Sequence, residues 1–286
     1  PIPRRQRQMC IRDRAVPDLD VPKLRWFCYH RDVAEVVHYR TFAIPKKSGG
    51  RRYISAPMPQ LKAMQKWILD KILVRMPVHE AAHGFVQGRS IVTNAAVHTN
   101  SEFVLSMDLK DFFPTLTFRR VKGLFRAMGY LEGIATVLAL ICTESPRQAV
   151  KVTDPDTKVE KWVHVAVGPR CLPQGSPASP MLTNLAAMRL DRRLTGFAQN
   201  HNIRFTRYAD DLTLSTPKGV EHKGAWLQGI VTKVVEDEGF RVHPTKTKLM
   251  GRGDRQEVTG LVVNDDMSPR VPIEVKAKLR AAIHNQ

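Results

Sequence analysis

The sequence predicts an α+β fold, because segments with strand-like and with helical patterns both occur along it. Residues 102–108 (EFVLSMD) alternate in the manner of a strand. Two further β-rich runs, residues 203–208 and 212–216, are separated by Ala-Asp-Asp alone, which predicts a hairpin. Residues 180–195 (PMLTNLAAMRLDRRLT) have apolar side chains at helical spacing and follow a proline-rich turn, so they are predicted to form a helix.

The other elements are predicted from the same local patterns. Residues 40–57 carry two β-rich runs around Ser48-Gly49-Gly50, which predicts a hairpin. Residues 60–75 place apolar side chains at helical intervals. Helices are also predicted at residues 21–40, 90–98, 119–128, 132–142 and 224–238, strands near 240–250 and 257–263, and an inserted hairpin at 151–167.

Composition indicates a folded protein with a polyanionic partner. The chain has 286 residues, and its 43% hydrophobic content is enough for one large domain or two interlocked ones. The formal net charge is +18 at pH 7, from Lys and Arg that are spread over the whole chain. Nucleic acid would relieve the self-repulsion of such a domain by neutralising phosphates. On charge alone, a merely basic protein or a membrane-surface binder is the alternative.

The cysteines indicate a cytoplasmic protein. Cys10, Cys28, Cys142 and Cys171 lie far apart and form no C-x-x-C pair, which argues against a disulfide framework and a zinc ribbon. Reduced thiols fit this pattern best. No apolar run approaches the ~18 residues of a membrane span and no signal-peptide pattern opens the chain, so no membrane partner is expected.

Both ends of the chain look cut. The chain begins with Pro1 rather than Met, and Met9 to Arg14 (MCIRDR) resembles translated sequencing adapter, which makes residues 1–14 suspect as native sequence. The last residues (IEVKAKLRAAIH) follow a helical pattern without a C-cap before Gln286. We therefore expect the C-terminal end to lie inside a structural element.

Acidic residues at the ends of predicted strands are the main candidates for chemistry. The segment RYADDLTLS places Asp210 and Asp211 in a tight hairpin turn. Asp is a common turn residue, so the pair alone is most often structural. Asp108, however, ends the strand predicted at residues 102–108, and the three acids meet if the strands are neighbours in one sheet. Carboxylates packed so closely repel each other, and divalent cations relieve the repulsion.

Such a cluster is suited to a reaction at phosphorus. Two Mg²⁺ ions about 3.5–4 Å apart support in-line displacement, in which one lowers the pKa of the attacking hydroxyl and the other neutralises departing pyrophosphate. No general base on the protein is then required, and the sequence offers no Ser-His-Asp or Cys-His arrangement. Two Mg²⁺ ions are therefore the expected cofactors.

The order of four segments resembles the motifs of reverse transcriptases. Asp108 with Phe112-Phe113 resembles motif A, LPQGSPASP (residues 172–180) motif B, and YADD (residues 208–211) motif C. KTK (residues 246–248), downstream of a helix and a glycine, resembles the lysine of motif D. The resemblance covers residues 40–284 and implies a right-hand polymerase fold with fingers, a palm and a truncated thumb.

The resemblance also implies roles for single residues in the palm. Asp108, Asp210 and Asp211 would be the metal carboxylates, with the Leu109 carbonyl as a further ligand. Lys246 would donate a proton to pyrophosphate, a role for which Lys248 competes.

Other residues would bind the incoming dNTP. Phe113 stands where the family has an aromatic steric gate beneath the sugar; an ordinary core aromatic is the alternative, and Phe112 is the next candidate. Gln174 and Gly175 would line the nucleotide pocket. Arg52 would reach the triphosphate, and the weaker candidates, which also suit a solvated basic turn, are Lys46, Lys47 and Arg51.

Two further elements resemble retron reverse transcriptases in particular. Residues 94–98 (NAAVH) match the NAxxH element of that family, and residues 258–260 match its VTG element. A retron enzyme recognises its own structured non-coding RNA, primes DNA synthesis from a guanosine 2′-OH and makes multicopy single-stranded DNA (msDNA), an RNA–DNA hybrid used in anti-phage defence with an effector protein. RNA contacts are expected from Asn94, His98, Val258, Thr259, Gly260, Arg270, Lys276, Lys278 and Arg280.

The resemblance implies an order of domains and leaves alternatives open. We expect an N-terminal helical and basic segment at 1–40, fingers at 41–101, a palm at 102–250 with an insertion near 143–170, and the end of the palm with the start of the thumb at 251–286. A group II intron-type or diversity-generating reverse transcriptase is the alternative within the class, and local hydrogen bonding is the alternative role of Asn94 and His98. From another class, the chain could be a catalytically idle RNA-binding scaffold.

Overall fold

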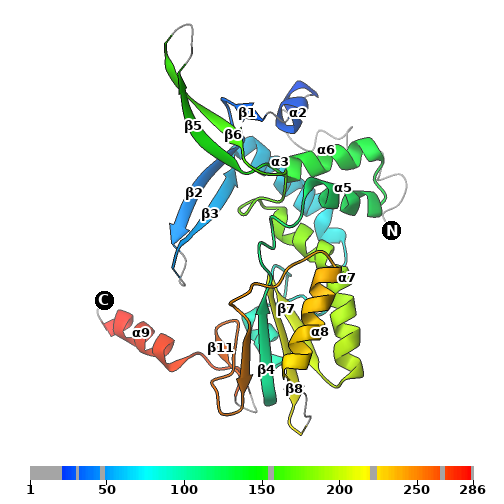
Figure 1. The fold of residues 1–286 in the computed structure, drawn as a ribbon, viewed down its shortest axis with the longest axis vertical. Helices are drawn as coiled ribbons and strands as arrows, with labels where there is room; N and C mark the ends of the chain where they lie inside the picture. The colour runs from blue at the N-terminus through cyan, green and yellow to red at the C-terminus, as the bar shows by residue number, and fades with distance from the viewer. Residues whose placement is uncertain are drawn as a thin grey trace. The chain divides into compact units, whose positions relative to one another are not determined.

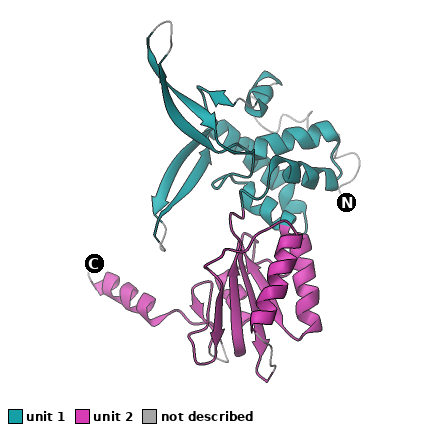
Figure 2. Cartoon of the chain, in the orientation of Figure 1, with its two compact units in different colours: residues 1–77, 113–186 teal, residues 78–112, 187–286 magenta. Residues whose placement is uncertain are grey.

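The chain divides into two compact units, each built from two stretches of sequence (Figures 1 and 2). The computed structural model describes residues 21–29, 32–45, 49–153, 158–219, 224–264 and 268–284. The first unit comprises residues 1–77 and 113–186, and the second comprises residues 78–112 and 187–286. The long helix α7 (Ser179–Asn200) begins in the first unit and ends in the second.

The first unit combines helices with two small antiparallel sheets. Strands β2 (Tyr39–Pro45) and β3 (Arg51–Pro57) form one hairpin. A second sheet has the order β1-β6-β5, from β1 (Val33–Ala34), β6 (Glu160–Ala166) and β5 (Arg147–Thr153). Its helices are α2 (Val21–Cys28), α3 (Pro59–Lys71), the 3₁₀ turn η2 (Leu73–Arg75), α5 (Phe118–Ala127) and α6 (Glu132–Cys142).

The second unit is built on a four-stranded antiparallel sheet of order β7-β8-β4-β9. Its strands are β4 (Ser101–Asp108), β7 (Arg204–Tyr208), β8 (Asp211–Pro217) and β9 (Lys248–Gly251). Helix α8 (Gly224–Asp237) lies beside the second half of α7 along this sheet (Figure 1), and Arg193 of α7 pairs with Asp237 at 2.8 Å. The other elements are α4 (Ile91–Ala96), β10 (Glu257–Val258), β11 (Leu261–Val262) and α9 (Ile273–His284).

The core of the second unit explains why β4 lies inside the sheet. Val104, Leu105 and Met107 of β4 are fully buried, as are Leu212 and Leu214 of β8. A strand whose side chains are buried on both faces gains most from having paired neighbours on both edges. β4 accordingly pairs with β8 on one edge and β9 on the other, and its last residue is Asp108.

Several predicted boundaries differ from the structure. The helix predicted at 21–40 ends at Cys28, because the chain then enters β1 and Val33 pairs with Val165 of β6. The inserted hairpin begins at Arg147, earlier than predicted, and gains β1 as a third strand. The strand predicted near 240–250 is shorter in the structure and covers residues 248–251. Before it, Val242 makes only an isolated bridge to Leu109. Residues 1–20, Lys46, Lys47 and Ser48 lie outside the described residues.

A membrane-spanning helix was not expected from the sequence. Across the described ranges, none of the helices combines the length and apolar character needed to cross a bilayer.

Candidate active site

The three candidate acids meet at one end of the four-stranded sheet. Asp108 ends β4 and stands opposite Asp211 in the β4–β8 register. The β7–β8 hairpin closes on the pair Tyr208↔Asp211, so its turn consists of Ala209 and Asp210. Asp211 is therefore the first residue of β8, whereas both acids were expected in the turn. Ala209 takes the left-handed conformation (φ 56°) that such a two-residue turn requires.

Backbone hydrogen bonds lock the turn to the end of β4. The Leu109 amide donates to the Asp210 carbonyl at 2.8 Å, and the His243 amide donates to the Asp108 carbonyl at 2.7 Å. Leu109 itself is buried. Since backbone groups fix the peptides around Asp108 and Asp210, the relative placement of the two strand ends does not depend on their side chains.

The acids form a strongly negative cluster beside one lysine. Burial, followed by the negative charges of Asp210 and Asp108, raises the pKa of Asp211 to about 7, while the positive charge of Lys246 opposes this shift. The Lys246 ammonium lies 2.7 Å from Asp108 Oδ1. Lys248 lies on β9 opposite Ser106, so Lys246 is the motif D lysine that contacts an acid in this structure.

The carboxylates are suitable ligands for a hard divalent cation, but their arrangement is not that of a complete metal site. Carboxylate oxygen is the donor that Mg²⁺ prefers, and the raised pKa of Asp211 reflects negative charge that a cation would neutralise. Among the described residues, no three His, Cys, Asp or Glu side chains are arranged as a ready metal site. One of the three carboxylates, that of Asp108, is paired with the Lys246 ammonium.

The nucleotide candidates of the first unit form a second group. The Ser55 amide of β3 donates to the Gln174 carbonyl at 2.7 Å. Gly175 has φ +122°, and a Cβ there would lie 2.8 Å from the Ser55 carbonyl oxygen, so only glycine fits. This contact sets the motif B segment against the hairpin that carries the exposed Arg52. Lys46 and Lys47 lie outside the described residues.

The two candidate gate residues differ in their surroundings. Phe112 is buried in the second unit, with its ring centroid 5.7 Å from that of Phe240, so it is a core aromatic. Phe113 belongs to the first unit and is partly exposed. Phe113 is therefore the one of these two residues whose side chain is accessible to a nucleotide sugar.

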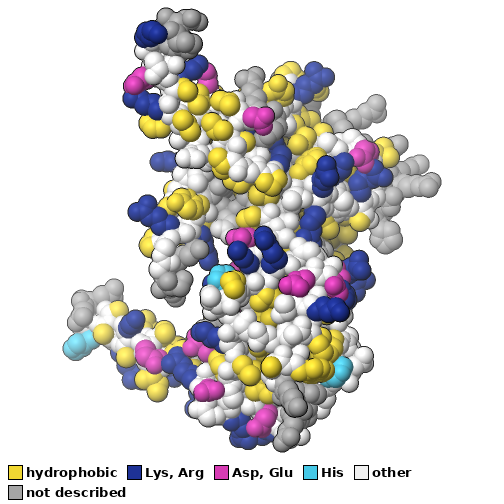
Figure 3. Space-filling view, viewed as in Figure 1, with side chains coloured by type: hydrophobic (Ala, Val, Ile, Leu, Met, Phe, Trp, Pro, Cys, Tyr) yellow, Lys and Arg dark blue, Asp and Glu magenta, His cyan; other side chains and the backbone are white. Residues whose placement is uncertain are grey.

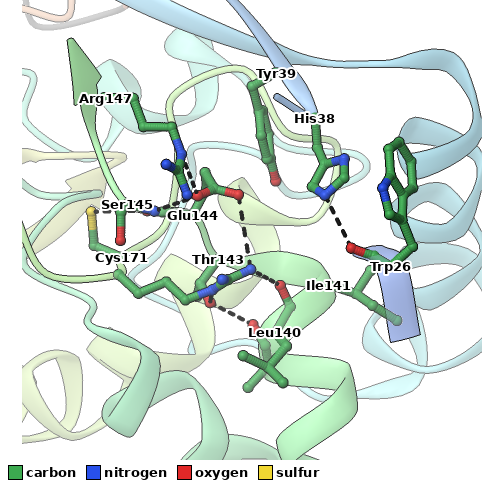
Figure 4. A network of polar contacts seen from close by, with 12 residues as sticks. Trp26, His38, Tyr39, Leu140, Ile141, Thr143, Glu144, Ser145, Arg147 and Cys171 are labelled. Carbon is green, nitrogen blue, oxygen red and sulfur yellow. Dashed lines mark hydrogen bonds and ion pairs between the residues drawn. The ribbon is translucent and has the colours of Figure 1, made fainter. Parts of the chain in front are cut away.

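A polar network that the sequence analysis missed supports motif B (Figure 4). Glu144 and Cys171 exchange two backbone hydrogen bonds, of 2.9 and 3.0 Å. The Glu144 carboxylate, only 11% exposed, pairs with Arg147 at 3.3 Å and with Arg170 at 3.9 Å. Arg170 also donates to the Leu140 carbonyl at 2.9 Å. The signal in the sequence is an acid two residues after an apolar helix, and this signal does not identify its basic partners.

The NAxxH element is buried rather than presented to RNA. His98 has no exposed surface, and its Nδ1 and Nε2 lie 2.8 Å from Ser215 Oγ and 2.7 Å from Thr206 Oγ1. His98 thereby bridges both strands of the hairpin that carries Asp210. Burial lowers the pKa of His98 to about 3, with a smaller contribution from the nearby Arg204 charge, so the ring is neutral. Asn94 is also fully buried, so neither side chain has a surface that RNA can contact. The burial of both side chains favours the alternative role of local hydrogen bonding.

The VTG element packs on the same short helix. β10 and β11 are joined by Thr259 (φ 47°) and Gly260 (φ 82°), a turn in which both residues are left-handed. Thr259 Oγ1 donates to the Ile91 carbonyl at 3.3 Å, and the Asn94 amide approaches Thr259 Oγ1 at 3.5 Å. Val258 is buried in one apolar cluster with Ala95. Only Thr259 and Gly260 of this element keep surface for a partner.

The basic candidates near the C-terminal end are all solvent-exposed. α9 buries none of its residues, and it carries Lys276, Lys278 and Arg280. Arg270 is exposed as well, while its backbone pairs with that of Val262. Lys and Arg side chains also lie scattered over the face of the molecule in Figure 3 rather than gathered at one end.

His98→Ala is expected to lower the free energy of unfolding by about 2–4 kcal/mol, because two buried hydroxyls lose their partner and a cavity forms. The folded pKa of His98 lies below its ordinary value of 6.5, so its contribution to stability is complete above about pH 6.5 and is lost as the pH falls toward 3. Thermal unfolding between pH 4 and 8 should show this dependence in the wild type and a weaker one in the variant.

Val97→Ala is the matched control, since Val97 is the neighbouring residue and 37% exposed. Val97→Ala should leave the thermal midpoint nearly unchanged. An unchanged midpoint in His98→Ala would refute the structural role of its two hydrogen bonds and favour the predicted role in RNA recognition.

A comparison with protein families shows which class of protein this fold belongs to. The family described as "Reverse transcriptase (RNA-dependent DNA polymerase)" matches residues 44–263. The chain belongs to this family, and within it to the retron reverse transcriptases. It is 33% identical to the retron Ec86 reverse transcriptase of Escherichia coli over 93% of this chain and 74% of that protein.

Two retron reverse transcriptases of Myxococcus xanthus are more similar. Identity is 50% to the Mx162 enzyme and 43% to the Mx65 enzyme, over 94% of this chain in both cases. The chain spans 56% and 60% of the lengths of these two relatives.

Solved structures show the same fold at low identity. Telomerase from Candida albicans, solved with a TWJ fragment of telomeric RNA, matches with a TM-score of 0.54 and 12% identity, over 89% of this chain and 49% of that one. The expectation of a right-hand polymerase fold with mixed helices and strands is confirmed.

Proposed function

We propose that this chain is the catalytic part of an RNA-directed DNA polymerase that makes msDNA from its own structured non-coding RNA. The observation that carries the proposal is the register that sets Asp108 opposite Asp211, with Asp210 in the adjoining turn. Membership of the retron reverse transcriptase family supports the same activity. The proposed domains are an N-terminal segment at 1–40, fingers at 41–101, a palm at 102–250 with an insertion near 143–170, and the end of the palm with the start of a thumb at 251–286.

In this proposal Asp108, Asp210 and Asp211 hold two Mg²⁺ ions, with the Leu109 carbonyl as a further ligand. When bound, such ions supply a lowered pKa for the attacking hydroxyl and neutralise charge on pyrophosphate. Lys246 would donate a proton to the leaving pyrophosphate, and its ammonium position 2.7 Å from Asp108 Oδ1 supports this role.

The nucleotide residues have separate tasks in this proposal. Gln174 and Gly175 shape the pocket through their backbone, which approaches β3 closely. Arg52, with Lys46 as the weaker candidate, binds the triphosphate by charge. Phe113 presents a ring that clashes with a ribose 2′-OH and so selects dNTPs over ribonucleotides.

RNA binding is assigned to exposed groups. Arg270, Lys276, Lys278 and Arg280 would neutralise phosphates, and Thr259 and Gly260 offer a tight turn to an RNA backbone. Asn94, His98 and Val258 would act indirectly, by holding that turn and the catalytic hairpin in place. An effector protein of anti-phage defence and a cytoplasmic location complete the proposal.

The test is synthesis on the RNA encoded beside the gene. Intact protein, that RNA, dNTPs and Mg²⁺ are expected to give DNA joined to the RNA by a 2′–5′ bond, which a debranching enzyme releases. Replacing the branching guanosine by its 2′-deoxy form should stop the reaction. DNA made only from a 3′-OH would favour the group II intron-type or diversity-generating alternative, and RNA binding without any DNA would favour the idle scaffold.

A further inference from the structure

A fully buried ion pair lies directly behind the turn that carries Asp210. Arg207 of β7 and Asp191 of α7 have no exposed surface. Arg207 Nε donates to Asp191 Oδ1 at 2.7 Å, and a terminal nitrogen donates to Oδ2 at 2.7 Å. This bidentate ion pair offsets the desolvation free energy that burial of both charges costs.

The third guanidinium nitrogen reaches the catalytic turn. It donates to the carbonyl oxygen of Ala209 at 2.9 Å, and Ala209 is the left-handed residue immediately before Asp210. The guanidinium carbon lies 5.8 Å from the centre of the Phe112 ring, so an aromatic face supports the charge as well. A pair that served only to fill the core would need no contact with this carbonyl.

Backbone contacts hold Arg207 itself in place. Its amide donates to the Ala81 carbonyl and its carbonyl accepts from the His83 amide, both at 2.7 Å. Next to them, a Cβ on Gly84 would lie 2.5 Å from the Ala209 nitrogen. The segment 81–84 is therefore in close contact with the turn at Ala209, while the Arg207 guanidinium donates a hydrogen bond to the Ala209 carbonyl.

We infer that Arg207 and Asp191 are positioning residues: their ion pair fixes the Ala209–Asp210 peptide and thereby the orientation of Asp210 toward Asp108. Neither side chain touches substrate. The link to β4 is the hydrogen bond from the Leu109 amide to the Asp210 carbonyl, at 2.8 Å. The inference rests on the proposed polymerase function only for its effect on catalysis.

The test uses two variants of the intact protein. Arg207→Met/Asp191→Leu removes both charges together, so no uncompensated charge is left in the core and the protein is expected to fold. Arg207→Lys keeps the charge pair, but a single ammonium cannot reach both Asp191 oxygens and the Ala209 carbonyl at once. Arg193→Met is the matched control, because Arg193 lies two residues along α7, is 37% exposed, and pairs with Asp237 and Glu238 rather than with the turn.

Three measurements are read together. Hydrogen exchange at the Leu109 amide should quicken by about tenfold or more in both variants. The kcat for primer extension should fall about 100-fold with the KM for dNTP nearly unchanged, because the acids are misplaced rather than lost. Binding of Mn²⁺ in the absence of nucleic acid, followed by electron paramagnetic resonance, should weaken. The control should match the wild type in all three.

The possible outcomes separate the two ideas. A folded double variant with wild-type Leu109 exchange and near wild-type kcat overturns the positioning role. If the double variant fails to fold, Arg207→Lys decides by the same criteria. A wild-type protein without polymerase activity, whose Leu109 protection is still lost in the variants, overturns the proposed function and leaves the positioning role standing.

Discussion

Asp210→Asn and Asp211→Asn are each expected to abolish primer extension, with a loss of about 10³-fold or more, while RNA affinity stays nearly unchanged. An amide keeps the size of the carboxylate but removes the charge that a cation needs, so transition-state stabilisation is lost. In the proposed function RNA is held elsewhere, by phosphate contacts from exposed Lys and Arg side chains. Extension assays and gel shifts on the same preparations measure the two quantities.

The acid cluster provides an internal check on folding. Burial and two like charges raise the pKa of Asp211 against the opposing attraction of Lys246, so removing the charge relieves more repulsion than it costs in attraction, and the thermal midpoint should not fall. Asp237→Asn is the control, since Asp237 lies on α8 and pairs with Arg193. Chelation of Mg²⁺ should reproduce the loss in the wild type, reversibly. Extension near the wild-type rate in either variant would refute the catalytic assignment.

Phe113→Ala is expected to lower discrimination against ribonucleotides by about 100-fold, measured as the ratio of kcat/KM for dNTP over rNTP. In the proposed role of Phe113 as a steric gate, loss of the ring removes the clash with the 2′-OH and leaves dNTP binding nearly intact. The ratio is the informative quantity, because it compares transition states in one enzyme and cancels differences in active fraction.

Phe112→Ala separates the gate from the core. Phe112 is 2% exposed and packs on Phe240, so its truncation should destabilise the fold by about 3–5 kcal/mol while the ratio stays constant. An unchanged ratio in Phe113→Ala together with an altered ratio in Phe112→Ala would move the gate to Phe112.

Local patterns predicted the elements that carry the site. Alternation in residues 102–108 and the short gap between the two β-rich runs placed Asp108 at a strand end and Asp210 in a turn, as the structure has them. The same patterns could not place Asp211 in β8 rather than in the turn, because the assignment depends on its pairing with Tyr208. Register between strands about 100 residues apart is a property of the packed sheet, which local periodicity does not encode.

The hydrogen-bond and ion-pair partners of buried polar residues could not be predicted from the sequence, for a different reason. His98 was recognised in the sequence, but its contacts with Ser215 and Thr206 join residues more than 100 positions apart. The sequence did not predict a role for Arg207, which lies close to the acids, because a charged residue in a strand is usually exposed. Its burial is tolerated because Asp191 meets it from a helix, and spacing along the chain does not reveal such a pairing.

The two-residue strand β1 has a practical consequence for how the gene is cut for expression. Val33 and Ala34 pair with Val165 and His164, and the Ala166 amide donates to the Asp32 carbonyl at 2.7 Å. A version of the protein that starts after Ala34 leaves this border of β6 uncovered, and an uncovered strand is a template onto which a second copy can add its own backbone. Start sites upstream of Asp32 therefore favour a monodisperse preparation over one prone to self-association.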